Sequence, residues 1–258
     1  MKMADFYLTL PSNSSMTQYP NNHTGHYFTQ LPQNIDLTGH DYEIGLAEIQ
    51  IPNSYWNVGK NTTMLSIKTS RTASTKTLFL RAGLYATPEE LIFSLNELIK
   101  LAYTKEEKKT IMYSKFFYNR ASKKAILKIY EKGGEIQLNP TLQHILGMSG
   151  EIMTGPAEFE GDRNVDVHVG SYSIYVYCDL VLHRQVGDVM VPLLRVVPSN
   201  DKTTDMIYQI FEKPHYQRLA RTQFNTVEIL LTTDTGKPLS FANGTVVVTL
   251  HVRSRRLF

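Results

Sequence analysis

The sequence contains a single cysteine, Cys178, in 258 residues, so it cannot form an intramolecular disulfide. This favours a reducing compartment, because disulfides accumulate in secreted proteins. The sequence also lacks any run of about 18 apolar residues, the length that a membrane-spanning helix needs, and its first residues lack the long apolar stretch of a signal peptide. We therefore expect a protein of the cytoplasm or nucleus that does not cross a membrane.

Motifs that carry catalysis are missing as well. The 15 glycines are scattered and form neither a P-loop nor a dinucleotide-binding turn. Cys178 is the one possible thiol nucleophile, but it falls on the apolar face of a predicted strand, where a thiol is buried and unreactive. His23 and His26 have an H-x-x-H spacing in a turn-rich stretch without a further ligand, which favours two exposed loop histidines over a zinc site. We predict no catalytic residue, no metal site, no cofactor and no enzymatic activity. A cysteine hydrolase using Cys178 is the enzyme alternative.

Positive charge is unevenly distributed. The net charge of +3 argues against a dedicated nucleic-acid-binding protein. Residues 100–132 nevertheless hold ten Lys or Arg against three Glu. Solvated loops and strand faces explain such a cluster most simply, and contact with a phosphate backbone is the alternative. A second basic cluster near the end of the sequence consists of Arg253, Arg255 and Arg256, which are candidates for weak contact with nucleic acid.

Strand patterns dominate both ends of the sequence. Apolar and polar residues alternate over 6–10, 227–231 and 246–252, which is typical of half-buried strands. Within 41–51 the apolar phase shifts by one residue after Leu46, and such a shift predicts a β-bulge.

The segment 172–198 is the most unusual part of the sequence. In its first half, Ile174, Val176 and Cys178 alternate with Tyr175 and Tyr177, as in a strand with one buried face. From Val189 to Leu194 both faces are apolar, so we expect a strand covered on both faces, either by another part of the chain or by a neighbouring subunit. The candidate interface residues are Val189, Val191, Leu193, Tyr175 and Tyr177.

The middle of the sequence changes character. Thr87, Pro88 and Glu90 form a capping box with a proline at the first helical position, which predicts a helix from 88 to about 103. Residues 62–148 give the order β-β-α-β-β-β-α, and the Gly-, Pro- and acid-rich segment 149–164 is interpreted as a return linker. The flanking regions, 1–61 and 165–258, must then pair with each other. We predict a mainly β protein, a β-sandwich with an inserted α+β subdomain.

Long runs of the sequence resemble the minor capsid (penton) proteins of Maverick/Polinton elements and adintoviruses. The runs occur in the expected order across essentially the whole chain. In the β-sandwich they are DFYLTLPSNSSM (5–16), YEIGLAEI (42–49), YVYCD (175–179), VGDV (186–189), VPLLR (191–195), DTGKP (234–238) and VVVTLHVR (246–253). In the insertion they are G-x-Y-x-T-x-E-E-L (83–91) and L-x-x-I-L-G (142–147).

The resemblance implies a single jelly roll with no catalysis. It implies homopentamers at the fivefold vertices of an icosahedral capsid, in contact with a double-jelly-roll major capsid protein. The protein would be a virion component made in the host cytoplasm, with the nucleus left open as the place of assembly. A separate hypothesis is that Arg253, Arg255 and Arg256 face the capsid interior and touch nucleic acid or another virion component. The alternative from another class is a lectin-like or receptor-attachment jelly-roll module that uses the aromatic strand face or the basic insertion as its binding surface.

Overall fold

A computed structural model describes residues 5–60, 62–69, 75–104, 113–168, 172–199 and 206–255. The chain divides into two compact units. The jelly-roll unit consists of residues 1–55 and 170–258, and the inserted unit consists of residues 56–169. The sequence placed these boundaries a few residues away, at 61/62 and 164/165. No helix of the described residues is both long and apolar enough to cross a membrane.

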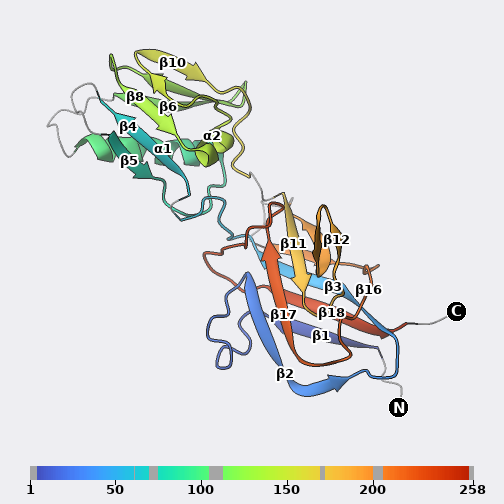
Figure 1. Cartoon of the computed structure of the whole chain (residues 1–258). Coiled ribbons are helices and arrows are strands. Elements are labelled where there is room, and N and C mark those ends of the chain that lie inside the picture. Colours follow the sequence, from blue (N-terminus) through green and yellow to red (C-terminus); the bar gives the residue numbers. More distant parts are fainter. Residues whose placement is uncertain are drawn as a thin grey trace. The chain divides into compact units, whose positions relative to one another are not determined.

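The jelly-roll unit is built around two large antiparallel sheets, both visible in Figure 1. The first sheet has the order β1 (Phe6–Pro11), β18 (Val247–Ser254), β3 (Tyr42–Pro52) and β15 (Met206–Ile210), with the short β16 (Gln217–Arg218) also paired to β3. The second has the order β14 (Leu193–Pro198), β11 (Ser173–Cys178), β17 (Gln223–Thr232) and β2 (His26–Asp36). This alternation of early and late strands in two facing sheets is the jelly-roll arrangement. The predicted fold class, a mainly β single jelly roll with an inserted α+β subdomain, is confirmed.

The alternating residues of both sheets form the core of the jelly-roll unit. Fully buried side chains include Ile44, Leu46, Ile174, Val176, Ile229, Val248 and Leu250. Tyr27 on β2 joins the two sheets, because its hydroxyl donates a hydrogen bond to the carbonyl oxygen of Leu10 on β1 at 2.9 Å. The predicted bulge is present in β3. Thr249 faces Glu48 while Leu250 faces Leu46, so Ala47 has no partner in the ladder.

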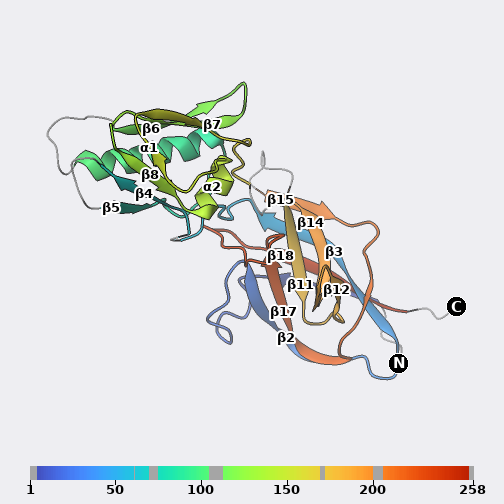
Figure 2. The same cartoon turned by 45° about the horizontal axis from the view of Figure 1, so that its top comes forward.

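The described residues of the inserted unit form two further sheets and two helices, drawn in teal, green and yellow in Figure 2. One sheet has the order β5 (Thr75–Phe79), β4 (Met64–Lys68), β8 (Glu135–Leu138) and β9 (Met153–Thr154). The other has the order β10 (Ala157–Glu160), β7 (Lys124–Ile129) and β6 (Ser114–Asn119). The helices are α1 (Pro88–Thr104) and α2 (Pro140–Leu146). Its core is separate from that of the jelly-roll unit and includes Leu91, Leu95, Phe116, Leu127, Ile136 and Leu146.

Local signals explain where the helices begin and end. At the start of α1, the Glu90 backbone N–H donates to Thr87 Oγ1, as the predicted capping box requires. The Glu90 carboxylate accepts from the backbone N–H of Ala86, one residue before the expected donor Thr87. Asn139 caps the start of α2 by accepting from the Leu142 backbone N–H. Gly147 ends α2 with a φ of 64°, the left-handed conformation that glycine adopts without strain.

The segment 149–164 differs from the expected linker. It contains β9, which pairs with β8, and β10, which pairs with β7, so it belongs to the two sheets of the inserted unit. Both strands lie at sheet edges and are short, and each places one apolar side chain, Met153 or Phe159, against the core. Edge strands with Gly, Pro and acidic residues resemble linkers in sequence, because one of their faces and one of their edges stay in water.

Candidate functional site

The apolar run from Val189 to Leu194 does not form one doubly covered strand, and that prediction is wrong. Val189–Val191 is strand β13, which forms a hairpin with β12 (Arg184–Val186) around Gly187, whose φ is 60°. Val189 is 51% exposed and Met190 is 61% exposed. Pro192 follows, and the chain enters β14 at Leu193 in a different sheet. The apolar run therefore consists of the second strand of an exposed hairpin, Pro192 and the first residues of a sandwich strand.

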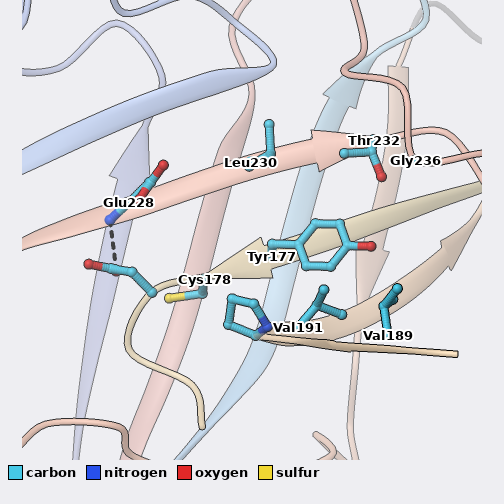
Figure 3. A pocket seen from close by; sticks show the side chains of 10 residues that line it. Tyr177, Cys178, Val189, Val191, Glu228, Leu230, Thr232 and Gly236 are labelled. Carbon is cyan, nitrogen blue, oxygen red and sulfur yellow. Dashed lines mark hydrogen bonds between the residues drawn. The ribbon is translucent and has the colours of Figure 1, made fainter. Parts of the chain in front are cut away.

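A cavity of about 380 Å³ lies beside this hairpin, shown in Figure 3. It is lined by Tyr177, Cys178, Asp179, Val189, Val191, Pro192, Glu228, Leu230, Thr232 and Gly236. The hairpin contributes Val189 and Val191, and strands β11 and β17 contribute most of the opposite wall. A cavity of this size with mainly apolar walls is typical of a binding site. We call these walls the hairpin surface.

The structure brings three of the five candidate interface residues to this one place, namely Tyr177, Val189 and Val191. Tyr175 is half-buried and lies on β11 opposite Val196. Leu193 pairs with Tyr177, but it is only 3% exposed and offers almost no accessible area.

Two carboxylates lie at the polar part of the cavity, and each is already paired. Asp179 accepts a hydrogen bond from the Glu228 backbone N–H at 2.9 Å and forms an ion pair with Arg221. Burial raises the pKa of the Asp179 carboxyl, an effect that Arg221 partly opposes. The Glu228 carboxylate lies 2.7 Å from Nε2 of His26. The Asp179 contact fixes the loop after β11 against β17, and the Glu228 contact joins β17 to β2.

The other sequence-derived candidates for chemistry are structural. Cys178 borders the cavity, but its side chain is buried in the core, and burial raises the pKa of its thiol. His23 is exposed, as expected, whereas His26 is the first residue of β2 and is half-buried beside Glu228. Within the described residues, no group of three or more His, Cys, Asp or Glu side chains could hold a metal ion.

The basic residues near the end of the chain differ in their availability. The Arg253 guanidinium lies 2.6 Å from the Glu43 carboxylate and stacks 3.4 Å from the centre of the Tyr216 ring. Its charge is therefore neutralised within the jelly-roll unit. The Arg255 backbone N–H donates to the Asp41 carbonyl oxygen. Arg256 lies outside the described residues.

Part of the basic cluster at 100–132 is also paired. Lys128 forms an ion pair with Glu158 at 2.8 Å, and Arg120 forms one with Glu89 at 2.9 Å. Lys105, Lys108 and Lys109 lie outside the described residues. The ion pairs favour the simpler interpretation, in which these residues form a solvated face.

The fold is a single jelly roll with an α+β unit inserted between β3 and β11, which are the third and fourth jelly-roll strands along the chain. No family model matches this chain, and a search of curated proteins found no match. Among solved structures, the crystal structure of the mavirus penton protein is similar over 97% of this chain and 100% of that chain, with a TM-score of 0.50 and 13% identity. A chain of the cryo-EM structure of the Sputnik virophage matches over 98% of both chains, with a TM-score of 0.46 and 12% identity. At 13% identity, the likeness to the mavirus penton protein establishes a shared fold.

Proposed function

We propose that this protein is a structural capsid protein that forms homopentamers at the fivefold vertices of an icosahedral, virus-like capsid. The observation that carries the proposal is the jelly roll with its inserted unit, which is similar from end to end to a penton protein. The long sequence runs shared with penton proteins of Maverick/Polinton elements and adintoviruses support the same function. The protein acts by assembly, without a catalytic step.

The hairpin surface is our candidate for one side of the pentamer contact. In a closed ring, two different patches of each subunit meet its two neighbours. Val189 is 51% exposed and lines an apolar cavity, an arrangement in which a neighbour's side chain can be buried between hairpin and sheet. Met190 alternates with it on β13 and is on the other face of the hairpin. Tyr177 and Val191 line that cavity, and Tyr175 extends the same strand face. Leu193 is the first residue of β14 and is buried, so it stabilises that strand and offers little area to a neighbouring subunit.

Analytical ultracentrifugation and negative-stain microscopy of the purified protein test the proposal. We expect rings of five subunits. Val189→Asp should abolish the rings while the far-UV circular dichroism spectrum stays unchanged, because this side chain lines the cavity, is 51% exposed, and can carry a charge without disturbing the core. Ile152→Asp is the matched control, since Ile152 is 57% exposed but lies in the inserted unit. A protein that stays monomeric at all concentrations would contradict the pentamer. Rings that tolerate Val189→Asp would contradict the assignment of this surface.

The proposed partner is a double-jelly-roll major capsid protein, and the proposed location is the virion. Co-expression with a double-jelly-roll major capsid protein should give particles with this protein at the vertices, which cryo-EM would locate. The proposed weak contact with nucleic acid depends on Arg255 and Arg256, because Arg253 is paired with Glu43. Genome packaging that is unchanged by Arg255→Gln together with Arg256→Gln would argue against it.

A lectin-like or receptor-attachment module is the alternative function. It predicts a stable monomer that binds glycans through the Tyr175 and Tyr177 strand face or through the inserted unit. A glycan array with the purified protein distinguishes the two, because a vertex protein without attachment function gives no signal above an unrelated control.

A further inference from the structure

Strand β15 is an edge strand without the usual protection. It pairs with β3, and no other strand of the described residues pairs with it. Its sequence, Met206–Ile210, contains no charged residue, whereas exposed edges in soluble proteins usually carry charges or prolines that prevent the addition of another strand. The outward-facing side chains of Tyr208 and Ile210 are 53% and 63% exposed. An apolar stripe therefore borders an edge that can accept a further strand.

Arg195 lies at the same flank of the jelly-roll unit. It is on β14, the edge strand of the other sheet, opposite the core residue Val176, so its side chain is on the inward-facing side of that sheet. Its guanidinium carbon lies 3.7 Å from the centre of the ring of Phe211, the residue that follows β15. A strand added beside β15 would direct alternate side chains toward the stripe and toward Arg195, because successive side chains point to opposite faces.

The Arg195 guanidinium has an unmet hydrogen-bonding requirement. Its Nη1 atom is shielded from solvent and has no hydrogen-bond partner in the described part of the chain. Burial lowers the pKa of this side chain, since the charged form has lost part of its hydration.

An inward-pointing charge can also serve only to protect an edge strand. A protecting arginine would keep its N–H groups in water, whereas Nη1 has lost water without gaining an acceptor. The Arg195 side chain as a whole is only half-buried, so a partner can approach its guanidinium group. A carboxylate is the acceptor that fits best, because it neutralises the charge and forms charge-assisted hydrogen bonds.

We propose that the free edge of β15 binds an extended segment of a partner protein as an added strand, and that this segment places an Asp or Glu side chain against Arg195. The segment has apolar residues at alternate positions on the side that faces Tyr208 and Ile210. Main-chain hydrogen bonds supply affinity in this mode of recognition, and the side-chain contacts supply specificity. The proposal goes beyond the capsid assignment and does not depend on it.

Selection of displayed random peptides against the full chain tests the proposal. The wild-type protein should enrich peptides that combine an acidic residue with alternating apolar residues. Fluorescence anisotropy with a selected peptide should show that Arg195→Gln binds it about tenfold more weakly than the wild type, or weaker still. Arg195→Lys should restore only part of the lost affinity, because lysine lacks the planar guanidinium group. Ile210→Lys should abolish binding, whereas Tyr7→Lys should not, since Tyr7 is equally exposed on the opposite edge strand β1. Circular dichroism verifies the fold of each variant.

Three results would overturn the proposal. The first is no enrichment over an uncoated surface. The second is a selected peptide that binds Arg195→Gln or Ile210→Lys as tightly as the wild type. The third is self-association that Ile210→Lys removes while no peptide is selected, because the edge would then bind a second copy of this chain. Ring formation is measured separately, so failure here leaves the pentamer proposal in place.

Discussion

Tyr27 links the two sheets of the jelly roll, and its substitution measures what that link contributes. The ring is fully buried, and the hydroxyl donates to the Leu10 carbonyl oxygen at 2.9 Å. Tyr27→Phe keeps the ring and creates no large cavity, so the loss is confined to one hydrogen bond and to a buried acceptor without this donor. Such an acceptor costs about 1–3 kcal/mol. We expect the unfolding free energy of the jelly-roll unit to fall by ~1–2 kcal/mol and its midpoint temperature by ~3–8 °C.

The effect of this substitution should depend on pH. Burial raises the pKa of Tyr27 well above its ordinary value of about 10. A group with a raised folded-state pKa contributes its full stability below the unfolded-state pKa and loses it as the pH rises further, because the unfolded chain ionises first. The phenylalanine variant cannot ionise there. The difference in stability between wild type and variant should therefore shrink above about pH 10.

Urea denaturation followed by far-UV circular dichroism, together with differential scanning calorimetry, measures both effects. The matched control is Tyr7→Phe, which removes a hydroxyl from an exposed ring on the outer face of β1 and should change stability by less than ~0.5 kcal/mol. If Tyr27→Phe is no more destabilising than Tyr7→Phe, the hydrogen bond to Leu10 does not stabilise the sandwich and the reasoning is refuted.

Three further predictions follow from buried or close contacts. Cys178 should not react with Ellman's reagent in the native protein at mildly alkaline pH and should react fully after unfolding, because the thiol is buried and its pKa is raised; rapid native labelling would contradict its placement in the core. Gly147→Ala should destabilise the inserted unit by about 1–3 kcal/mol in thermal unfolding, since φ is positive and a Cβ would lie 2.3 Å from the Arg163 carbonyl oxygen. Gly150→Ala, also at positive φ but with no atom within 4 Å of the new Cβ, should cost less. A double-mutant cycle of Glu43→Gln and Arg253→Gln should give a coupling energy of up to about 1 kcal/mol, and a value of zero would show that the ion pair adds nothing to stability.

Features encoded by neighbouring residues could be predicted from the sequence. The bulge at Ala47 follows from a one-residue phase shift within β3, and the start of α1 follows from the spacing of Thr87 and Glu90. In both cases the residues that carry the signal also make the contacts. The element order from β4 to α2 has the same basis, because each element there has its own apolar period.

Features that depend on distant residues could not be predicted. Alternation shows that Val189 is apolar on a strand, but it does not show whether that strand belongs to the sandwich or to a hairpin. The two-residue turn at Gly187 and Asp188 was the available signal, and a turn of this kind favours a tight hairpin. The pairing of Arg253 with Glu43 and the stacking of Arg195 on Phe211 arise only from the order of strands in the sheets, so no local pattern indicates them.

The strand order has a consequence for how the chain folds during synthesis. None of the first three strands pairs with another of these three, because β1 and β3 pair with β18 and β2 pairs with β17. All of their partners follow the inserted unit in the sequence, whereas the inserted unit is complete within one continuous stretch, 56–169. We expect the inserted unit to fold on the ribosome first. At that stage β1, β2 and β3 are unpaired, because their partner strands have not yet been synthesised. Such exposed segments are the usual targets of chaperones. The yield of the folded whole chain should therefore depend on chaperones more strongly than the yield of the inserted unit expressed alone.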